Sequence, residues 1–97
     1  MSRPDAALGL LEVRGMTAAV GAADAMAKAA PVDIGGPALI GDGLVTLFVL
    51  GEISAVGEAL EAGARTAERI GRLLACRLIG RPSPDLAGLF CIDDTPP

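Results

Sequence analysis

The segment LIGDGLVTLFVLG, residues 39–51, decides the fold of this chain. Of the seven residues at positions 44–50, six are apolar, and Gly51 follows them. A short apolar run that ends at a glycine is typical of a strand covered on both faces, so we expect this strand at the centre of a sheet. Just before it, Asp42 stands between Gly41 and Gly43, and an Asp-Gly pair is a strong signal for a tight turn. On the residues alone, a plain hairpin turn is the simplest interpretation of this loop.

The composition indicates one domain that associates with other subunits. The chain has 97 residues, enough for a single hydrophobic core. Hydrophobic residues make up 52% of it, yet only Phe48 and Phe90 are aromatic, and alanine and glycine supply much of the remainder. Small residues let neighbouring subunits approach closely, and surplus apolar surface on a small chain is usually buried in an interface. We therefore expect an oligomer.

The charge pattern argues against nucleic-acid and membrane partners. Eight basic and twelve acidic residues give a net charge of −4, and histidine, tyrosine and tryptophan are absent. Nucleic-acid binders usually combine a basic patch with aromatic stacking residues, which this chain lacks. Its apolar runs fall far short of the roughly 18 residues of a membrane span, and residues 1–5 are polar with no signal-type segment behind them. A cytoplasmic location is expected.

The two cysteines, Cys76 and Cys91, indicate neither a disulfide nor a metal site. Cysteines of a cytoplasmic protein are more often free thiols. Without histidine and without a close Cys-x-x-Cys pair, a zinc site would have too few ligands. We therefore expect no metal and no cofactor, with Cys76 in a strand and Cys91 in a C-terminal tail.

A strand and a helix are predicted ahead of residues 32–51. Residues 7–14 (ALGLLEVR) are a short apolar segment that ends in alternating charges, and they predict a strand. Residues 16–30 predict an amphipathic helix, which Pro31 ends because proline lacks the amide donor that a continuing helix needs. The apolar stripe expected on this helix consists of Met16, Ala19, Val20, Ala23, Met26, Ala27 and Ala30.

Two further elements flank the central strand. Residues 32–39 contain a Gly-Gly-Pro run at 35–37, so they predict a strand that is irregular or lies at a sheet edge. After the central strand a second helix is expected, capped by Glu52 or Ser54 and ending at Gly71. Its expected apolar stripe is Ile53, Val56, Leu60, Ala64, Ala67 and Ile70.

The remaining segments complete a familiar order of elements. Residues 73–79 predict a fourth strand, 80–84 a rigid turn and 85–90 one short helical turn, while 1–6 and 91–97 are expected to be tails, the latter mobile. The resulting order, β-α-β-β-α-β, predicts an α+β fold of the ferredoxin-like type. In this fold an antiparallel sheet carries both helices on one face.

No catalytic arrangement is evident in the sequence. Ser-His-Asp and Cys-His arrangements need histidine, and no two carboxylates stand out as an acid and base pair. The Gly41-Asp42-Gly43 loop lacks the third glycine and the following helix of a dinucleotide-binding fingerprint. Gly35 and Gly36 are not followed by a lysine at P-loop spacing. These observations predict a protein without catalysis.

Four segments of the chain resemble the hexamer-forming shell proteins of bacterial microcompartments, the BMC-domain proteins. The resemblance runs from about residue 7 to residue 89 without an evident insertion, with the motifs in family order and at family spacing. It implies a BMC shell domain over residues 7–90. The segments are ALGLLEVRGM (7–16), AADAMAKAA (22–30), IGDGLVT (40–46) and IGRP (79–82).

This resemblance implies a flat hexagonal tile with a central pore. In the family six subunits form the tile, tiles join edge to edge into a shell around enzymes, and a Lys-Ile-Gly-Ser-Gly loop of each subunit lines a pore on the sixfold axis. Carried onto this chain, the pore-lining residues are Leu39, Ile40, Gly41, Asp42 and Gly43. Leu39 replaces the lysine and Asp42 the serine, so we expect this pore to favour cationic or neutral polar solutes over anions.

The resemblance also implies which residues join one tile to the next. The family uses a lysine late in the first helix and an arginine before a proline after the last strand, which here are Lys28 and Arg81. Pro31 is the third expected edge residue and stands where the family often has asparagine. Leu50 occupies a position where arginine is common, and its role is not explained by the pattern.

The sequence thus predicts a homohexameric structural protein of a microcompartment shell. Its expected partners are other shell proteins, encapsulated enzymes and the small metabolites that cross the pore, with neither nucleic acid nor membrane among them. One alternative is a small ferredoxin-like regulator that binds a metabolite as a dimer or trimer. Another is a small enzyme of the acylphosphatase type, against which stands the complete absence of asparagine.

Overall fold

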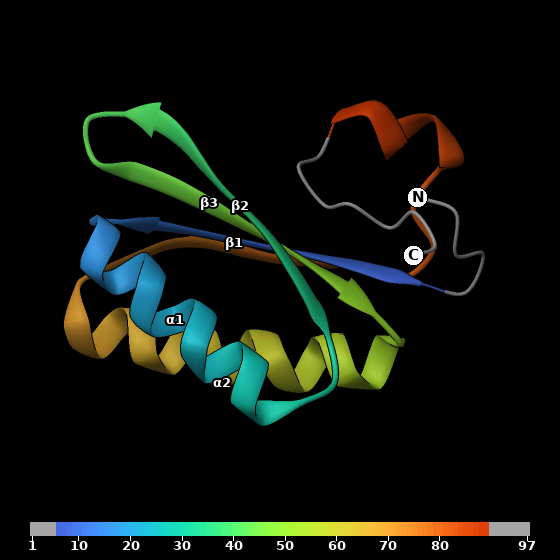
Figure 1. Ribbon diagram of the computed structural model, residues 1–97, viewed down its shortest axis with the longest axis horizontal. Helices are drawn as coiled ribbons and strands as arrows, with labels where there is room; N and C mark the ends of the chain where they lie inside the picture. Colours follow the sequence, from blue (N-terminus) through green and yellow to red (C-terminus); the bar gives the residue numbers. More distant parts are fainter. Residues whose placement is uncertain (1–5, 90–97) are drawn as a thin grey trace.

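The chain forms a four-stranded sheet with two long helices on one face and a short helix on the opposite side (Figure 1). The computed structural model describes residues 6–89, so Phe90, Cys91 and the predicted C-terminal tail lie outside the described part. Of the predicted N-terminal tail it describes only Ala6, which is buried. The elements are β1 (Ala7–Arg14), α1 (Met16–Ala29), β2 (Asp33–Gly41), β3 (Leu44–Gly51), α2 (Ile53–Ile70), β4 (Arg72–Ile79) and the 3-10 helix η1 (Pro84–Leu89).

The strand order β2-β3-β1-β4 confirms the predicted ferredoxin-like α+β fold. All three neighbouring pairs are antiparallel. β3 lies inside the sheet and is buried from Val45 to Gly51, as its apolar run predicts. β2 lies at one edge, and its register with β3 shifts between Gly35 and Ala38, next to the cis Gly36–Pro37 bond. The irregular edge strand predicted from the Gly-Gly-Pro run is therefore confirmed.

The core between the sheet and the helices depends on close approach of small residues. Leu11 and Val13 of β1 meet buried side chains of both helices there. A Cβ added to Gly63 of α2 would lie 2.6 Å from Met26 Cγ and 3.1 Å from Leu11 Cδ2, so only glycine lets α1 and α2 pack this tightly.

The stripe predicted on the first helix is partly wrong. Ala19 and Met26 are buried as predicted, but Val20 is 61% exposed and Ala22 takes a buried place instead. Alanines lie around most of this helix, so its two faces differ little in hydrophobicity and the sequence pattern cannot fix which of them faces the sheet. The residues of α1 that are buried are Ala18, Ala19, Ala22 and Met26.

The second helix follows its prediction more closely. Glu52 is the N-cap, because its side-chain Oε2 accepts hydrogen bonds from the amides of Ser54 at 3.0 Å and Ala55 at 3.3 Å. Ile53 and Ile70, the two ends of the predicted stripe, are exposed because the helix extends beyond the core at both ends. Altogether the described residues leave seven large apolar side chains exposed: Met16, Val20, Leu39, Ile40, Ile53, Ile70 and Leu78.

Candidate functional site

The hairpin between β2 and β3 has a backbone shape that favours glycine at most of its positions. Three consecutive residues have positive φ: 112° at Gly41, 55° at Asp42 and 76° at Gly43. Asp is among the few side-chain-bearing residues that tolerate the left-handed region. A Cβ added to Gly41 would meet no atom within 4 Å, so conformation, and not lack of space, requires glycine there. The predicted tight turn is confirmed.

The residues that lead into this turn point apolar side chains into solvent. Leu39 pairs with Val45 and Gly41 with Leu44, so Ile40 is one extra residue on β2 and forms a bulge. Leu39 is 68% and Ile40 60% exposed. The five residues at 39–43 are all exposed, and together they form a small projecting loop with one carboxylate at its tip.

The loop is held from outside by the junction between β1 and α1. The amide of Gly15 donates a hydrogen bond to the carbonyl oxygen of Gly43 at 2.7 Å. Arg14 Nη1 donates a hydrogen bond to the carbonyl oxygen of Asp42 at 2.5 Å. Two successive loop carbonyls are therefore fixed by residues that precede the loop by 28 positions.

The three predicted edge residues lie away from this loop, near the end of α1 and after β4, and are all exposed. Lys28 is in the last turn of α1, and its Nζ forms an ion pair with Asp24 Oδ2 at 2.7 Å, one helical turn earlier. Pro31 follows the extended C-cap residue Ala30, and Arg81 follows the end of β4.

The topology separates the loop from these edge residues. In an antiparallel βαββαβ chain, the β1–α1, β2–β3 and α2–β4 connections lie at one end of the sheet, and the α1–β2, β3–α2 and post-β4 connections lie at the other. Figure 1 shows the hairpin at one end of the sheet and the ends of α1 and β4 toward the other. The longest dimension of the molecule is 34 Å. Residues 39–43 are thus brought to one end, and Lys28, Pro31 and Arg81 to the opposite end.

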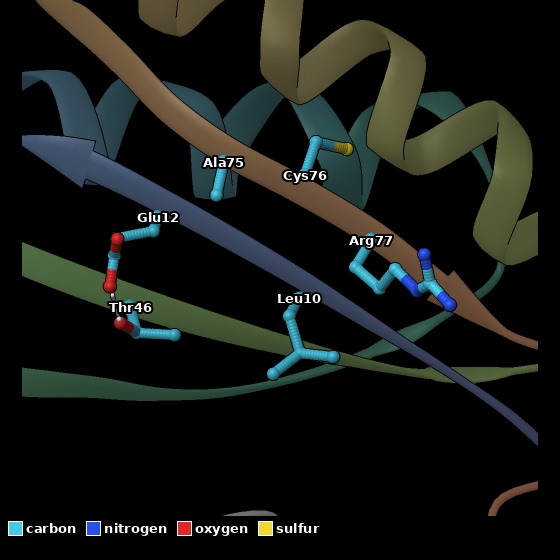
Figure 2. Close-up of a pocket in the computed structure, with 6 residues that line it drawn as sticks. All are labelled: Leu10, Glu12, Thr46, Ala75, Cys76 and Arg77. Atoms are coloured by element: carbon cyan, nitrogen blue, oxygen red, sulfur yellow. Dashed lines mark hydrogen bonds between the residues drawn. The ribbon is translucent and has the colours of Figure 1, made fainter.

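A shallow cavity of about 240 Å³ lies on the sheet between these two ends (Figure 2). The Thr46 hydroxyl lies 3.4 Å from Glu12 Oε2, to which it donates a hydrogen bond across the paired strands β1 and β3. Figure 2 shows the Cys76 side chain directed toward α2. The residue is exposed overall, and partial burial of its thiol raises the pKa above the ordinary value of 9.0. The lining is mostly apolar and comes from Leu10, Glu12, Thr46, Ala75, Cys76 and Arg77.

The described residues offer few of the features from which a catalytic or metal site is built. Between residues 6 and 89 no three His, Cys, Asp or Glu side chains are grouped closely enough to hold a metal ion. In the same range no buried side-chain nitrogen or oxygen lacks a hydrogen-bond partner. No helix of this part of the chain is long and apolar enough to cross a membrane.

The fold and the hairpin both lie within the part of the chain that matches a known domain family. The BMC domain family matches residues 7–82 of the chain, which include all four strands, both long helices and the loop at 39–43. The chain therefore belongs to the BMC-domain family of microcompartment shell proteins.

Three relatives show how broad this likeness is. The bacterial microcompartment shell protein EutM of Salmonella typhimurium is 46% identical over 86 residues, which cover 89% of this chain and 90% of EutM. The shell protein PduA of Citrobacter freundii is 48% identical over 80 residues, or 82% of this chain and 86% of PduA. The carboxysome shell protein CsoS1C of Hydrogenovibrio crunogenus is 41% identical over 92 residues, or 94% and 90% of the two chains.

A solved structure has the same fold. The crystal structure of a microcompartment protein from Desulfitobacterium hafniense DCB matches 84% of this chain with a TM-score of 0.75 and 28% sequence identity. The match covers 44% of that protein, so this chain corresponds to less than half of it.

Sequence reasoning did not identify the contact between the β1–α1 junction and the loop. In the sequence alone, Arg14 is an ordinary charged residue at the end of a strand. The signal that could have identified it is the sheet register: Arg14 pairs with Leu44, the first residue after the turn, so it must lie beside the loop. The cavity around Glu12 and Thr46 was also not anticipated, because it depends on side chains from three different strands.

Proposed function

We propose that this chain is the subunit of a homohexameric shell tile, which packs edge to edge with other tiles and has a central pore for small metabolites. The observation that carries the proposal is the separation of the loop at 39–43 from Lys28, Pro31 and Arg81. A subunit placed radially in a ring needs one end for the axis and the other for the rim. Membership of the BMC-domain family supports the same arrangement.

The axial end consists of Leu39, Ile40, Gly41, Asp42 and Gly43. Six copies of a projecting loop around an axis form a ring, and their exposed apolar side chains gain cover from neighbouring copies. If adjacent Asp42 carboxylates lie about 5 Å apart, each pair repels by roughly 1 to 3 kcal/mol at an effective dielectric between those of water and about 20. Such an acidic ring concentrates cations and excludes anions.

The rim end consists of Lys28, Pro31 and Arg81. Long basic side chains that lie along an apolar neighbour suit seams between subunits, because their stems bury apolar area while the charge stays solvated. Lys28 already lies against its own helix through Asp24, and at a seam the same ammonium can reach acceptors of the next tile.

The partners of such a tile are other copies of itself, other shell proteins and the enzymes that a shell encloses. Its place is the microcompartment shell in the bacterial cytoplasm, and its role is structural, with passage of metabolites and no catalysis. The alternative of a metabolite-binding regulator is not retained, because the relatives are named as shell and assembly proteins.

Mass measurement of the purified protein, combined with negative-stain microscopy, tests the proposal. A hexamer that forms sheets, tubes or shells is expected. The ring interface must be heterologous, since a cyclic hexamer joins a different patch on each side of the subunit. A discrete trimer, or a stable folded monomer at nanomolar concentration, would overturn the proposal.

A further inference from the structure

Arg14 occupies a position at the loop that its place in the sequence does not reveal. It is the last residue of β1 and pairs with Leu44 on one side and with Arg72 of β4 on the other. Its guanidinium donates to the carbonyl oxygen of Asp42. A Cβ added to Gly43 would lie 3.8 Å from Arg14 Cγ, so the arginine stem runs alongside the turn.

This contact lies at the part of the loop whose backbone conformation is least favourable. Three consecutive positive φ angles are an unusual conformation, and Asp42 adopts it with a side chain attached. The hydrogen bonds from Arg14 and Gly15 hold the Asp42 and Gly43 carbonyls, which belong to the two successive peptide groups on either side of the Gly43 Cα. Such bonds keep a short loop in one of the several shapes open to glycine-rich backbone.

The contact also determines which charges lie at the loop. Arg14 binds the backbone carbonyl of Asp42, and in the described part of the chain the two side chains form no ion pair. The Asp42 carboxylate is therefore left for solvent or solutes, with a guanidinium fixed on the other side of the same residue. A guanidinium stays charged throughout the physiological pH range.

We propose that Arg14 is the positioning residue of this loop and a determinant of its charge selectivity. It holds the Asp42 carbonyl, and its positive charge moderates the preference for cations that Asp42 creates. The selectivity part rests on the proposed function, since it requires the loop to line a pore. The positioning part concerns the loop of each subunit and does not depend on the pore.

Arg72 provides a matched control. It is also exposed, carries the same charge and lies opposite Arg14 at the same end of the sheet. β4 is separated from β3 by β1, so Arg72 is two strand spacings, roughly 10 Å, from the strand that begins at the loop. Arg14→Gln and Arg72→Gln remove equal charge, but only the first removes the bond to Asp42.

Hydrogen exchange of the Gly15 amide in the full assembled protein tests the positioning role. This amide is bonded to Gly43, so it reports directly whether the loop stays in place. Arg14→Gln should speed its exchange by about tenfold, whereas Arg72→Gln should change it by less than about twofold. Equal exchange in the two variants would overturn the positioning role, whatever the fate of the pore.

Uptake of a small anion and a small amine into assembled shells tests the selectivity role. Arg14→Gln should lower the ratio of anion to amine uptake several-fold, and more than Arg72→Gln does. Arg14→Lys keeps the charge and should restore the ratio, which also guards against a folding defect in the glutamine variant. If Arg14→Lys behaves like Arg14→Gln, the charge role is wrong. A third outcome is that Asp42→Ser leaves uptake unchanged while Arg14→Gln still speeds hydrogen exchange of the Gly15 amide. In that case the pore proposal fails and the positioning role stands.

Discussion

The two ends of the molecule differ in what gives them their shape. The hairpin end is defined by its backbone: three positive φ angles in a row, one bulge, and two hydrogen bonds from the β1–α1 junction. The opposite end is defined by exposed side chains at two connections, with Lys28 and Pro31 where α1 leads into β2 and Arg81 after β4. The ion pair of Lys28 with Asp24 at this end is internal to α1.

The two ends should therefore tolerate different changes. At the hairpin end, replacement of Asp42 changes the charge of the loop and keeps its backbone conformation. Replacement of a glycine changes the backbone conformation itself. At the opposite end, a side-chain replacement removes a long charged side chain that could contact the next tile, and it leaves the fold unchanged. Replacements at the two ends should therefore differ in what they change, assembly at one end and loop geometry or charge at the other.

Removal of a basic side chain from the rim end should weaken the joining of tiles. Lys28→Ala or Arg81→Ala should leave a folded hexamer, but each tile repeats the loss at six edges, and each lost contact costs about 1 kcal/mol. Negative-stain microscopy and sedimentation should show at least about a tenfold rise in the protein concentration at which sheets form.

Two control variants sharpen this prediction. Arg69→Ala removes an exposed basic residue from the last turn of α2, at the hairpin end, and should leave sheets intact. Asp24→Ala releases Lys28 from its ion pair and should likewise preserve sheets. Loss of the hexamer itself in Lys28→Ala or Arg81→Ala would assign these residues to the ring interface and would break the distinction between the ends.

Asp42→Ser should raise uptake of small anions into assembled shells by about tenfold, because it removes the acidic ring while the bonds from Arg14 and Gly15 still hold the turn. Uptake of a small amine should fall by a smaller factor. Equal anion uptake by the native and variant shells would mean that Asp42 does not set selectivity, either because the loop points away from the axis or because the pore is closed.

Two glycine replacements should have opposite effects on stability. Gly41→Ala forces a Cβ onto a backbone with φ of 112° and should lower the free energy of unfolding by about 1 kcal/mol. Gly57→Ala in α2 meets no atom within 4 Å and should raise it by about 0.5 kcal/mol, since alanine favours helix. Urea unfolding of both variants measures the two values. A stabilised Gly41→Ala would contradict the claim that backbone conformation defines the hairpin end.

Cys76, in the strand between the two ends, should give the smallest effect. Burial raises the pKa of its thiol above 9.0, so its thiolate is scarce at neutral pH, and alkylation in a Cys91→Ser background should be slower than that of a free thiol. The thiol contributes its full stability below the ordinary pKa, and this contribution declines as pH rises through the raised one. Labelling by iodoacetamide between pH 7 and pH 10 measures the rate. A rate that levels off below pH 9 would contradict the raised pKa.

The sequence was most informative where composition and backbone chemistry act together. The apolar run at 44–50 predicted an inner strand, the Gly-Gly-Pro run at 35–37 an irregular edge strand, and Asp42-Gly43 a turn, because each pattern permits few alternatives. It was least informative on α1, where alanine covers most faces and Val20 was misplaced. Contacts such as that of Arg14 with Asp42 depend on which strands become neighbours, and local patterns do not contain that information.

The hydrogen bond between Gly15 and Gly43 has a consequence for protein engineering. Residues 39–43 form a short projecting loop, which suggests that it could be exchanged between related proteins to transfer its charge selectivity. Their geometry nevertheless depends on the sequence at the β1–α1 junction, so the unit that can be transplanted is discontinuous and includes Arg14 and Gly15. A graft of the five loop residues alone would transfer the Asp42 carboxylate without the hydrogen bonds from Arg14 and Gly15 that fix its position.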